Sequence, residues 1–122
     1  LASSTGPLSP VGTGSMGAVA AGTAMLIVRR GPSEGTSFLL DADRVSVGRS
    51  DDSDVVLDDV TVSRQHAEFL RGDPGWQLRD LESLNGTYVN RDRIDGTATL
   101  SGGDEVQIGK YRFVFLVGGG QS

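Results

Sequence analysis

The sequence predicts an all-β protein, folded as an antiparallel β-sandwich of roughly 10 to 11 short strands. Three observations lead to this prediction. Short segments in which apolar and polar residues alternate recur from residue 24 to residue 117. Turn-forming residues separate these segments at intervals of about 6 to 12 residues. No long stretch shows the 3.6-residue period of an amphipathic helix.

The charged residues mark the part of the chain that folds. All 11 basic and 16 acidic side chains lie between Arg29 and Arg112 in a chain of 122 residues. We therefore expect one domain over residues 24–117. Residues 1–23 are uncharged and rich in Gly, Ser and Ala, which predicts a flexible leader. Residues 118–122 predict a flexible tail.

Composition excludes several classes of function. The net charge of −5 argues against general nucleic-acid binding, which needs a basic surface. With no cysteine and one histidine, the chain cannot form a thiolate site or a multi-histidine metal site, and we expect no cofactor. The longest apolar run, residues 18–28, is too short to span a bilayer and follows no basic segment. We expect a cytoplasmic monomer with no membrane partner.

Nine segments have the composition and alternation of strands. They cover residues 24–30, 36–40, 44–48, 54–57, 66–71, 75–81, 87–90, 104–108 and 110–117. Alternation also predicts which side chains face the core, because successive side chains of a strand point to opposite faces. Val45 and Val47 share one face of their segment, as do Trp76 and Leu78. The residues predicted to belong to the core are Trp76 and the face of the last segment that carries Tyr111, Phe113, Phe115 and Val117.

Turn residues connect these segments in order. The stretch 31–35 (GPSEG) predicts a hairpin between the first two segments, and 72–75 (GDPG) predicts a turn between the fifth and sixth. Asn85-Gly86 precedes the seventh segment, and both residue types tolerate positive φ. Gly109-Lys110 suits a two-residue turn between the last two segments.

Three loops contain residues that are typical of neither a core nor a generic turn. They cover 48–49 (GR), 63–66 (SRQH) and 83–87 (SLNGT). Loops at one end of a sandwich cluster in space although they are distant in sequence. Together these loops would present two guanidiniums, hydroxyls, an amide and backbone N–H groups. Such a set of donors fits a small, multiply charged anion such as a phosphate monoester.

The order GR, SxxH and NGT, at spacings of about 15 and 20 residues, resembles the forkhead-associated (FHA) domain family across roughly residues 25–117. The stretches LDDVTVSRQHAEF, SLNGTYVNR and GDEVQIGKYRFVFL are also similar to the small actinobacterial FHA regulators of the GarA/OdhI type. The resemblance implies an FHA-like sandwich that recognises phosphothreonine. Regulators of this type control 2-oxoglutarate and glutamate metabolism.

The resemblance also implies roles for individual residues. Arg49 matches the arginine that contacts the phosphate, and Ser63 the serine whose hydroxyl donates to it. Arg64 stands where the family often places a second donor. Asn85 matches the asparagine that binds the main chain of the peptide. At Leu84 some relatives carry a hydroxyl residue that reaches the phosphate, so here that contact would come from the backbone.

Four further residues match positions that brace the loops and do not touch the ligand. They are Gly48, His66, Gly86 and Thr87. An alternative for Ser63 and His66 is a nucleophile and base of a small hydrolase. This needs a third orienting group and an oxyanion hole. The sequence indicates neither, so we expect no enzyme.

Two functions agree with this resemblance. The first is a phosphothreonine-dependent module that binds phosphorylated proteins, including Ser/Thr protein kinases. The second is a phosphate-independent regulator of 2-oxoglutarate dehydrogenase or glutamate dehydrogenase. In the GarA/OdhI-type relatives, an upstream segment phosphorylated on threonine folds back onto the FHA face. Residues 1–23 do not match that segment, because Thr5, Thr13 and Thr23 are isolated.

Simpler interpretations apply to the charged residues. Arg49 could be a solvated arginine paired with Asp51 or Asp52. The acidic cluster could be mistaken for a calcium loop, but it lacks the order of an EF-hand. We expect it to form a solvated face that balances the arginines. Its members are Asp51, Asp52, Asp54, Asp58 and Asp59.

Overall fold

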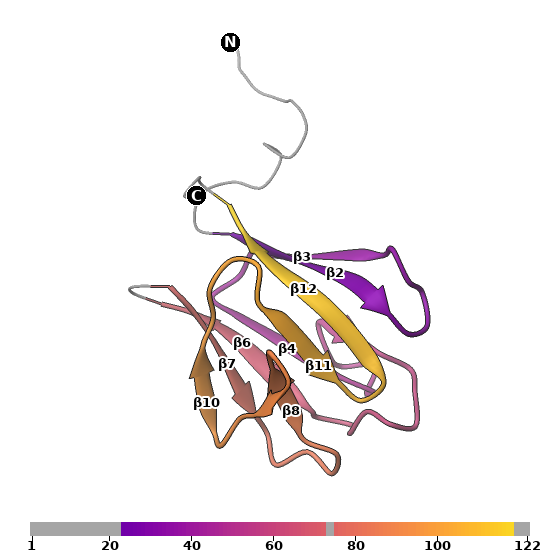
Figure 1. Cartoon of the computed structure of the whole chain (residues 1–122). Helices are drawn as coiled ribbons and strands as arrows, with labels where there is room; N and C mark the ends of the chain where they lie inside the picture. The colour runs from indigo at the N-terminus through magenta and orange to yellow at the C-terminus, as the bar shows by residue number, and fades with distance from the viewer. Residues whose placement is uncertain (1–22, 73–74, 119–122) are drawn as a thin grey trace.

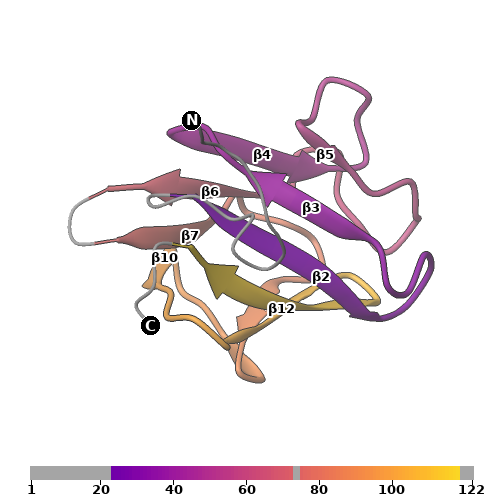
Figure 2. The ribbon, with the colours of Figure 1, turned by 90° about the horizontal axis from the view of Figure 1, so that it is seen from above.

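The protein folds as two β-sheets packed face to face (Figure 1). The structure is a computed structural model that describes residues 23–72 and 75–118. The view in Figure 2 shows β3, β2 and β12 lying across β4, β6 and β7. The leader predicted for 1–23 and the tail predicted for 118–122 lie, apart from Thr23 and Gly118, outside the described residues.

Eleven strands form the two sheets within the described part of the chain. The five-stranded sheet has the order β10 (Thr97–Thr99), β7 (Trp76–Asp80), β6 (Ala67–Arg71), β4 (Arg44–Gly48) and β5 (Val55–Val56). The six-stranded sheet has the order β3 (Ser37–Leu40), β2 (Ala24–Arg30), β12 (Tyr111–Val117), β11 (Glu105–Ile108), β8 (Thr87–Val89) and β9 (Asp92–Arg93). The predicted all-β sandwich is confirmed.

One strand pair departs from the antiparallel arrangement. Strands β4 and β5 run parallel, with Val47 opposite Val55. Side chains hold this short pair together, because Asp54 Oδ2 accepts a hydrogen bond from Ser46 N at 2.9 Å and Asp54 N donates to Ser46 Oγ at 2.9 Å. Asp54 is therefore more than part of the solvated acidic face that the sequence predicts.

Two strands of the sandwich were absent from the sequence-based prediction. Strand β9 consists of two exposed charged residues, and β10 has the sequence TAT with exposed ends. Neither shows the apolar alternation that identifies a half-buried strand. Each lies at the edge of a sheet, where pairing with β8 or β7 creates it.

Aromatic rings join the two sheets in the core. Phe69 of β6 stacks on Phe115 of β12 with ring centroids 6.3 Å apart, and Trp76 of β7 meets Phe115 edge-on at 6.5 Å. All three side chains are buried. The predicted inward face of β12 is confirmed for Tyr111, Phe113 and Phe115. The prediction that Val117 faces the core is wrong, because this residue ends the strand and its side chain is 41% exposed.

The two ends of the described domain meet. Gly118 N donates a hydrogen bond to Thr23 O at 2.9 Å, beside the pairing of Val117 with Ala24. Figure 1 shows this junction at the top of the sandwich, whereas the β4–β5, β5–β6 and β7–β8 loops lie at the bottom. The chain therefore enters and leaves at the end opposite these loops.

Replacing the central ring should cost much of the fold's stability. We predict that Phe115→Ala lowers the free energy of unfolding by about 3–5 kcal/mol, because it leaves a cavity between the sheets. Leu39→Ala, at a side chain 51% exposed on the outer face, is the control and should cost less than about 1 kcal/mol. Urea unfolding measures both. Equal losses for the two variants would contradict this account of the core.

Candidate functional site

The three loops singled out from the sequence meet at one end of the sandwich. Arg49 N donates to Ser63 O at 3.0 Å, and Ser50 N donates to Arg64 O at 3.2 Å. The third loop joins them because Leu84 N donates to Ser63 Oγ at 2.9 Å. Backbone hydrogen bonds thus join the first two loops, and the bond to the Ser63 side chain joins residues 21 positions apart. We call this loop cluster the binding end.

Gly48 allows the first two loops to approach so closely. A Cβ atom at this position would lie 2.1 Å from the backbone oxygen of Arg64 and 3.0 Å from Ser53 Oγ. Gly48 O also accepts from Leu57 N at 2.8 Å. Any side chain at position 48 would force the backbone of the first loop away from the backbone at Arg64.

The His66 imidazole connects the second loop to the third. The ring is fully buried, its Nδ1 accepts from Ser63 N at 3.0 Å, and its Nε2 lies 2.9 Å from Gly86 O. An Nδ1 that accepts must be unprotonated, so Nε2 carries the proton and donates to Gly86 O. Burial lowers the pKa of His66, although the Gly86 carbonyl and the Asp80 carboxylate act in the opposite direction.

A carboxylate behind the binding end holds the start of the third loop. Asp80 Oδ1 accepts from Ser83 Oγ at 2.6 Å and from Thr87 Oγ1 at 2.7 Å, and Asp80 Oδ2 accepts from Ser83 N at 3.2 Å. Burial alone would raise the pKa of Asp80, but these hydrogen bonds outweigh it and hold the pKa below its usual value. Sequence reasoning missed Asp80. The one signal was a Ser three residues later, a spacing typical of local side-chain capping.

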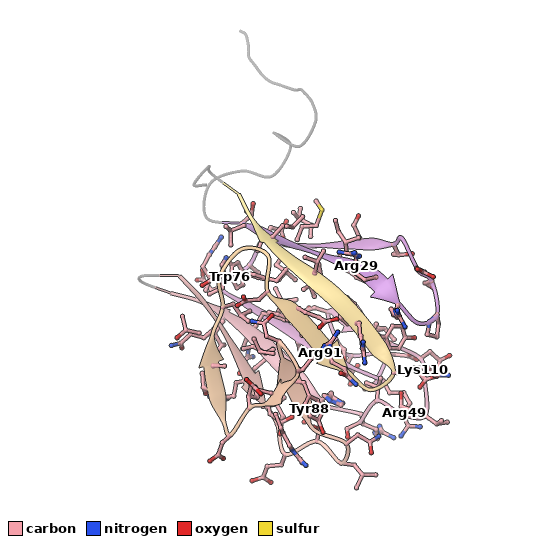
Figure 3. The ribbon with its side chains drawn as sticks, viewed as in Figure 1. Arg29, Arg49, Trp76, Tyr88, Arg91 and Lys110 are labelled. Carbon is pink, nitrogen blue, oxygen red and sulfur yellow. The ribbon has the colours of Figure 1, made fainter. Side chains whose placement is uncertain are left out.

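Two guanidiniums line a hollow at the binding end. The hollow has a volume of about 390 Å³ and is lined by Arg49, Ser50, Asp51, Asp52 and Arg64. Both arginines are exposed (Figure 3 labels Arg49). Within residues 23–72 and 75–118, neither guanidinium forms an ion pair, so the proposed pairing of Arg49 with Asp51 or Asp52 is not found.

Ser63 directly precedes Arg64 in the second loop, and the proton of its hydroxyl is available. A hydroxyl has one donor and two acceptor positions. Because Oγ accepts from Leu84 N, the bond orients the oxygen and leaves its O–H free to donate to an anion. The Leu84 backbone N–H, expected from the sequence to reach the phosphate, donates to Ser63 Oγ. The Leu84 side chain is 85% exposed.

Asn85 is fixed by one of its amide hydrogens. Asn85 Nδ2 donates to Thr61 O at 2.8 Å, which leaves Oδ1 available to accept from another group. Of the Asn85-Gly86 pair, only Gly86 adopts positive φ, at 86°. The Asn85 side chain therefore joins the third loop to the β5–β6 loop, and Gly86 supplies the positive φ.

A second anchor of the binding end was absent from the sequence-based analysis. Asp59 Oδ2 accepts from Thr61 N at 2.8 Å and from Thr61 Oγ1, and Asp59 Oδ1 pairs with Lys110 Nζ at 3.1 Å. Thr61 Oγ1 in turn accepts from Lys110 N at 2.9 Å. These contacts join the β5–β6 loop to the β11–β12 turn, so Asp59 also differs from a merely solvated acid.

The sandwich and its loops match a known protein family. The sequence pattern described as "FHA domain" matches residues 45–109. The chain belongs to the FHA domain family. The predicted resemblance, including the similarity to GarA/OdhI-type proteins, is confirmed.

Curated FHA relatives carry regulatory names. The chain is 53% identical over 116 residues to the glycogen accumulation regulator GarA of Mycolicibacterium smegmatis, covering 90% of this chain and 73% of that protein. It is 50% identical over 116 residues to the oxoglutarate dehydrogenase inhibitor of Corynebacterium glutamicum, covering 95% of this chain and 79% of that protein. The chain is 58% identical over 97 residues to GarA of Mycobacterium tuberculosis. This match covers 80% of the present chain but only 59% of that protein.

Solved FHA structures share the architecture. The structure of Mycobacterium tuberculosis EmbR in complex with a low-affinity phosphopeptide has a TM-score of 0.74 at 33% identity, covering 82% of this chain and 26% of that one. A structure from an analysis of phosphothreonine-dependent FHA domain interactions has a TM-score of 0.70 at 28% identity, covering 78% of this chain and 96% of that one.

The geometry does not support the hydrolase alternative. Both ring nitrogens of His66 contact backbone atoms, so neither accepts from the Ser63 hydroxyl. The FHA family and the regulator names of its relatives point to a non-catalytic regulatory protein. Among the described residues, no group of three or more His, Asp or Glu side chains could hold a metal ion. The same residues include no helix long and apolar enough to cross a membrane.

The close approach at Gly48 can be tested directly. We predict that Gly48→Ala lowers the free energy of unfolding by about 1–3 kcal/mol, because the new Cβ would collide with the Arg64 backbone. Gly75→Ala is the control, since a Cβ there meets no atom within 4 Å. Urea unfolding compares the two. A fully stable Gly48→Ala protein would show that the loops can separate without loss.

The buried histidine predicts a pH dependence of stability. Unfolding exposes His66, which then takes up a proton near its ordinary pKa of about 6.5, whereas the folded form resists protonation. The unfolded state therefore binds more protons as the pH falls below about 6.5, and stability falls by up to about 1.4 kcal/mol per pH unit. Urea unfolding between about pH 7 and 5.5 measures this slope.

His66→Gln provides the control for this slope. The chain has one histidine, so the variant should lose the pH dependence in that range while remaining less stable than the parent. An unchanged slope in the variant would assign the effect to other groups.

Proposed function

We propose that the chain is a phosphothreonine-dependent protein-binding module. The observation that carries this proposal is that the exposed guanidiniums of Arg49 and Arg64 line one hollow, and that Ser63, whose hydroxyl proton is free, directly precedes Arg64. The two guanidiniums have no carboxylate partner within the described residues. A phosphate group offers the charge and the acceptor oxygens that these donors lack.

The chemistry of the donors supports a phosphate ligand. A phosphorylated threonine carries nearly two negative charges at neutral pH and three strong acceptor oxygens. Arg49 and Arg64 can each present a planar fork of N–H donors, and Ser63 adds a short hydroxyl donor. Each charge-assisted bond contributes about 1.5–3 kcal/mol. After the cost of ordering an extended peptide, dissociation constants of about a micromolar are expected.

Asn85 is proposed to hold the main chain of the bound peptide. Thr61 O already accepts from one amide hydrogen of this exposed side chain, so Oδ1 remains as an acceptor and the second N–H as a donor. An extended peptide presents N–H and C=O groups alternately and can satisfy both. Gly48, His66, Gly86 and Thr87 are proposed to act indirectly, by holding the loops that carry Arg49, Ser63 and Asn85.

Relatives suggest the partners. The EmbR structure contains a phosphopeptide, and other relatives are named as oxoglutarate dehydrogenase inhibitors. We propose phosphorylated proteins as partners of this chain, including Ser/Thr protein kinases. A second candidate function, favoured by the inhibitor names, is phosphate-independent binding of 2-oxoglutarate dehydrogenase or glutamate dehydrogenase by the same loops. We further propose that the protein acts in the cytoplasm as a monomer.

The proposal predicts a strict dependence on phosphate and on Arg49. We expect micromolar binding to a degenerate peptide library with phosphothreonine, and none to the same library with unmodified threonine. Arg49→Ala should weaken binding at least about tenfold, since it removes a charge-assisted bond. Arg44→Ala, at an exposed arginine of β4 outside the hollow, is the control and should bind normally. Isothermal calorimetry measures the affinities.

A phosphoserine library distinguishes the ligand further, because preference for threonine requires a niche for its methyl group. Failure of all libraries to bind would contradict the first function. Binding of intact 2-oxoglutarate or glutamate dehydrogenase by the unmodified protein would then support the second.

A further inference from the structure

A second positive surface lies on the outer face of the six-stranded sheet. Four arginines line one hollow of about 290 Å³, and we call them the arginine surface: Arg29, Arg30, Arg91 and Arg112. Within the described residues, Glu105 is the one acidic side chain that lines the same hollow. Such a concentration of positive charge is unexpected in a chain with a net charge of −5.

An irregularity in β2 aims two consecutive arginines at this hollow. Val28 lies opposite Phe113, and Arg30 lies opposite Arg112, so Arg29 is an extra residue in the pairing of β2 with β12. In a regular strand, neighbouring side chains point to opposite faces. A bulge redirects a side chain, and bulges are frequent beside functional sites. Here both Arg29 and Arg30 are exposed on the outer face.

The charges of the arginine surface are largely uncompensated. Across residues 23–72 and 75–118, no ion pair involves Arg29, Arg30 or Arg112. Arg91 makes one long contact with Glu105, at 3.7 Å from Nε to Oε1. Gathering like charges around one hollow is unfavourable unless an anion joins them. The arrangement therefore favours a ligand that carries several negative charges.

The arginine surface continues into the hollow beside Asn85. That hollow, of about 510 Å³, is lined by Thr61, Asn85, Tyr88, Arg91, Gln107, Gly109, Lys110 and Arg112. Arg91 and Arg112 line both hollows, so the two hollows are adjacent, and we call the pair the groove. In Figure 3, Arg29, Arg91 and Lys110 lie along the six-stranded sheet, and Arg49 lies beyond Lys110 toward the loops.

We propose that this groove binds an acidic segment of the same polypeptide that presents the phosphothreonine. The inference rests on the proposed function, because the segment reaches the groove past Asn85. Neighbouring strands lie about 4.8 Å apart, so crossing from β11 over β12 to β2 takes about 10 Å, or three to four extended residues. Aspartate and glutamate carboxylates match the forked donors of arginine.

A polypeptide fits this groove better than a nucleic acid does. The hollow at Arg49 is lined by Asp51 and Asp52 as well as by arginines, and the chain is acidic overall. These acids would repel the continuous charge of a nucleic acid, whereas a peptide can place its carboxylates only where the arginines lie.

Extended phosphopeptides test the inference. The tightest phosphothreonine peptide from the library is lengthened at either end with a short run of glutamate or an equal run of serine. For the parent protein, we expect the glutamate run on one end to tighten binding about tenfold relative to serine, with the gain lost at high salt. Fluorescence anisotropy measures each affinity.

Charge reversal locates the effect. Arg29→Glu should reduce the glutamate gain to less than about threefold, while leaving the affinity for the serine-extended peptide unchanged. Arg44→Glu is the matched control on the other sheet, where an exposed arginine without an ion pair among the described residues is likewise reversed. It should keep the full gain.

The outcomes separate this inference from the proposed function. If the unextended phosphopeptide does not bind, the proposed function fails and the groove has no role in it. If the unextended phosphopeptide binds, but a glutamate run improves the affinity at neither end, the groove inference alone is wrong. A glutamate gain that persists in Arg29→Glu would also overturn it, because the acidic segment would then bind elsewhere.

Discussion

The binding end depends on one buried imidazole. His66 occupies a position where the chain passes from the β5–β6 loop into β6, and each of its ring nitrogens contacts the backbone of a different loop. Its own backbone is held as well, because His66 N donates to Val47 O and His66 O accepts from Leu81 N. A neutral ring is required, since protonated Nδ1 could not accept from Ser63 N. Burial favours this neutral ring, and the ring in turn holds the Ser63 backbone in place.

Different residues of the sandwich hold the structure rigid and present the donors to a ligand. Stacked aromatic rings join the two sheets, while the close approach at Gly48 and the polar contacts of Asp80 and the Asp59–Thr61–Lys110 cluster hold the loops. The exposed donors then lose little further freedom when they bind a ligand, which favours affinity from few contacts. Ser63 shows this economy, because its oxygen accepts a bond that orients it and its proton remains for the ligand.

Much of the fold can be predicted from the sequence, and the limits have physical causes. Alternation identified every strand with a buried face, from Val45 and Val47 in β4 to Phe113 and Phe115 in β12. It could not identify β9 or β10, whose residues become strands only by pairing at a sheet edge. The candidate site residues came from short motifs. Thr61 acts through a contact across 49 residues, and the bulge at Arg29 depends on strand register, so no local pattern predicts them. Asp80 bonds to Ser83 and Thr87, three and seven residues later, and only the spacing to Ser83 marked it in the sequence.

Because Thr23 and Gly118 lie side by side, the domain is suited to insertion into other proteins. Since the chain enters and leaves at adjacent points, opposite the loops, the unit can be inserted between two neighbouring residues of another protein without stretching its host. It can equally be joined in series with other domains while its recognition surface points away from the junction. In such an assembly, a second binding domain on the same chain would raise the local concentration of a shared partner, and modest affinities would combine into strong attachment. The matched region covers 26% of the EmbR chain, so this fold also occurs within a longer protein.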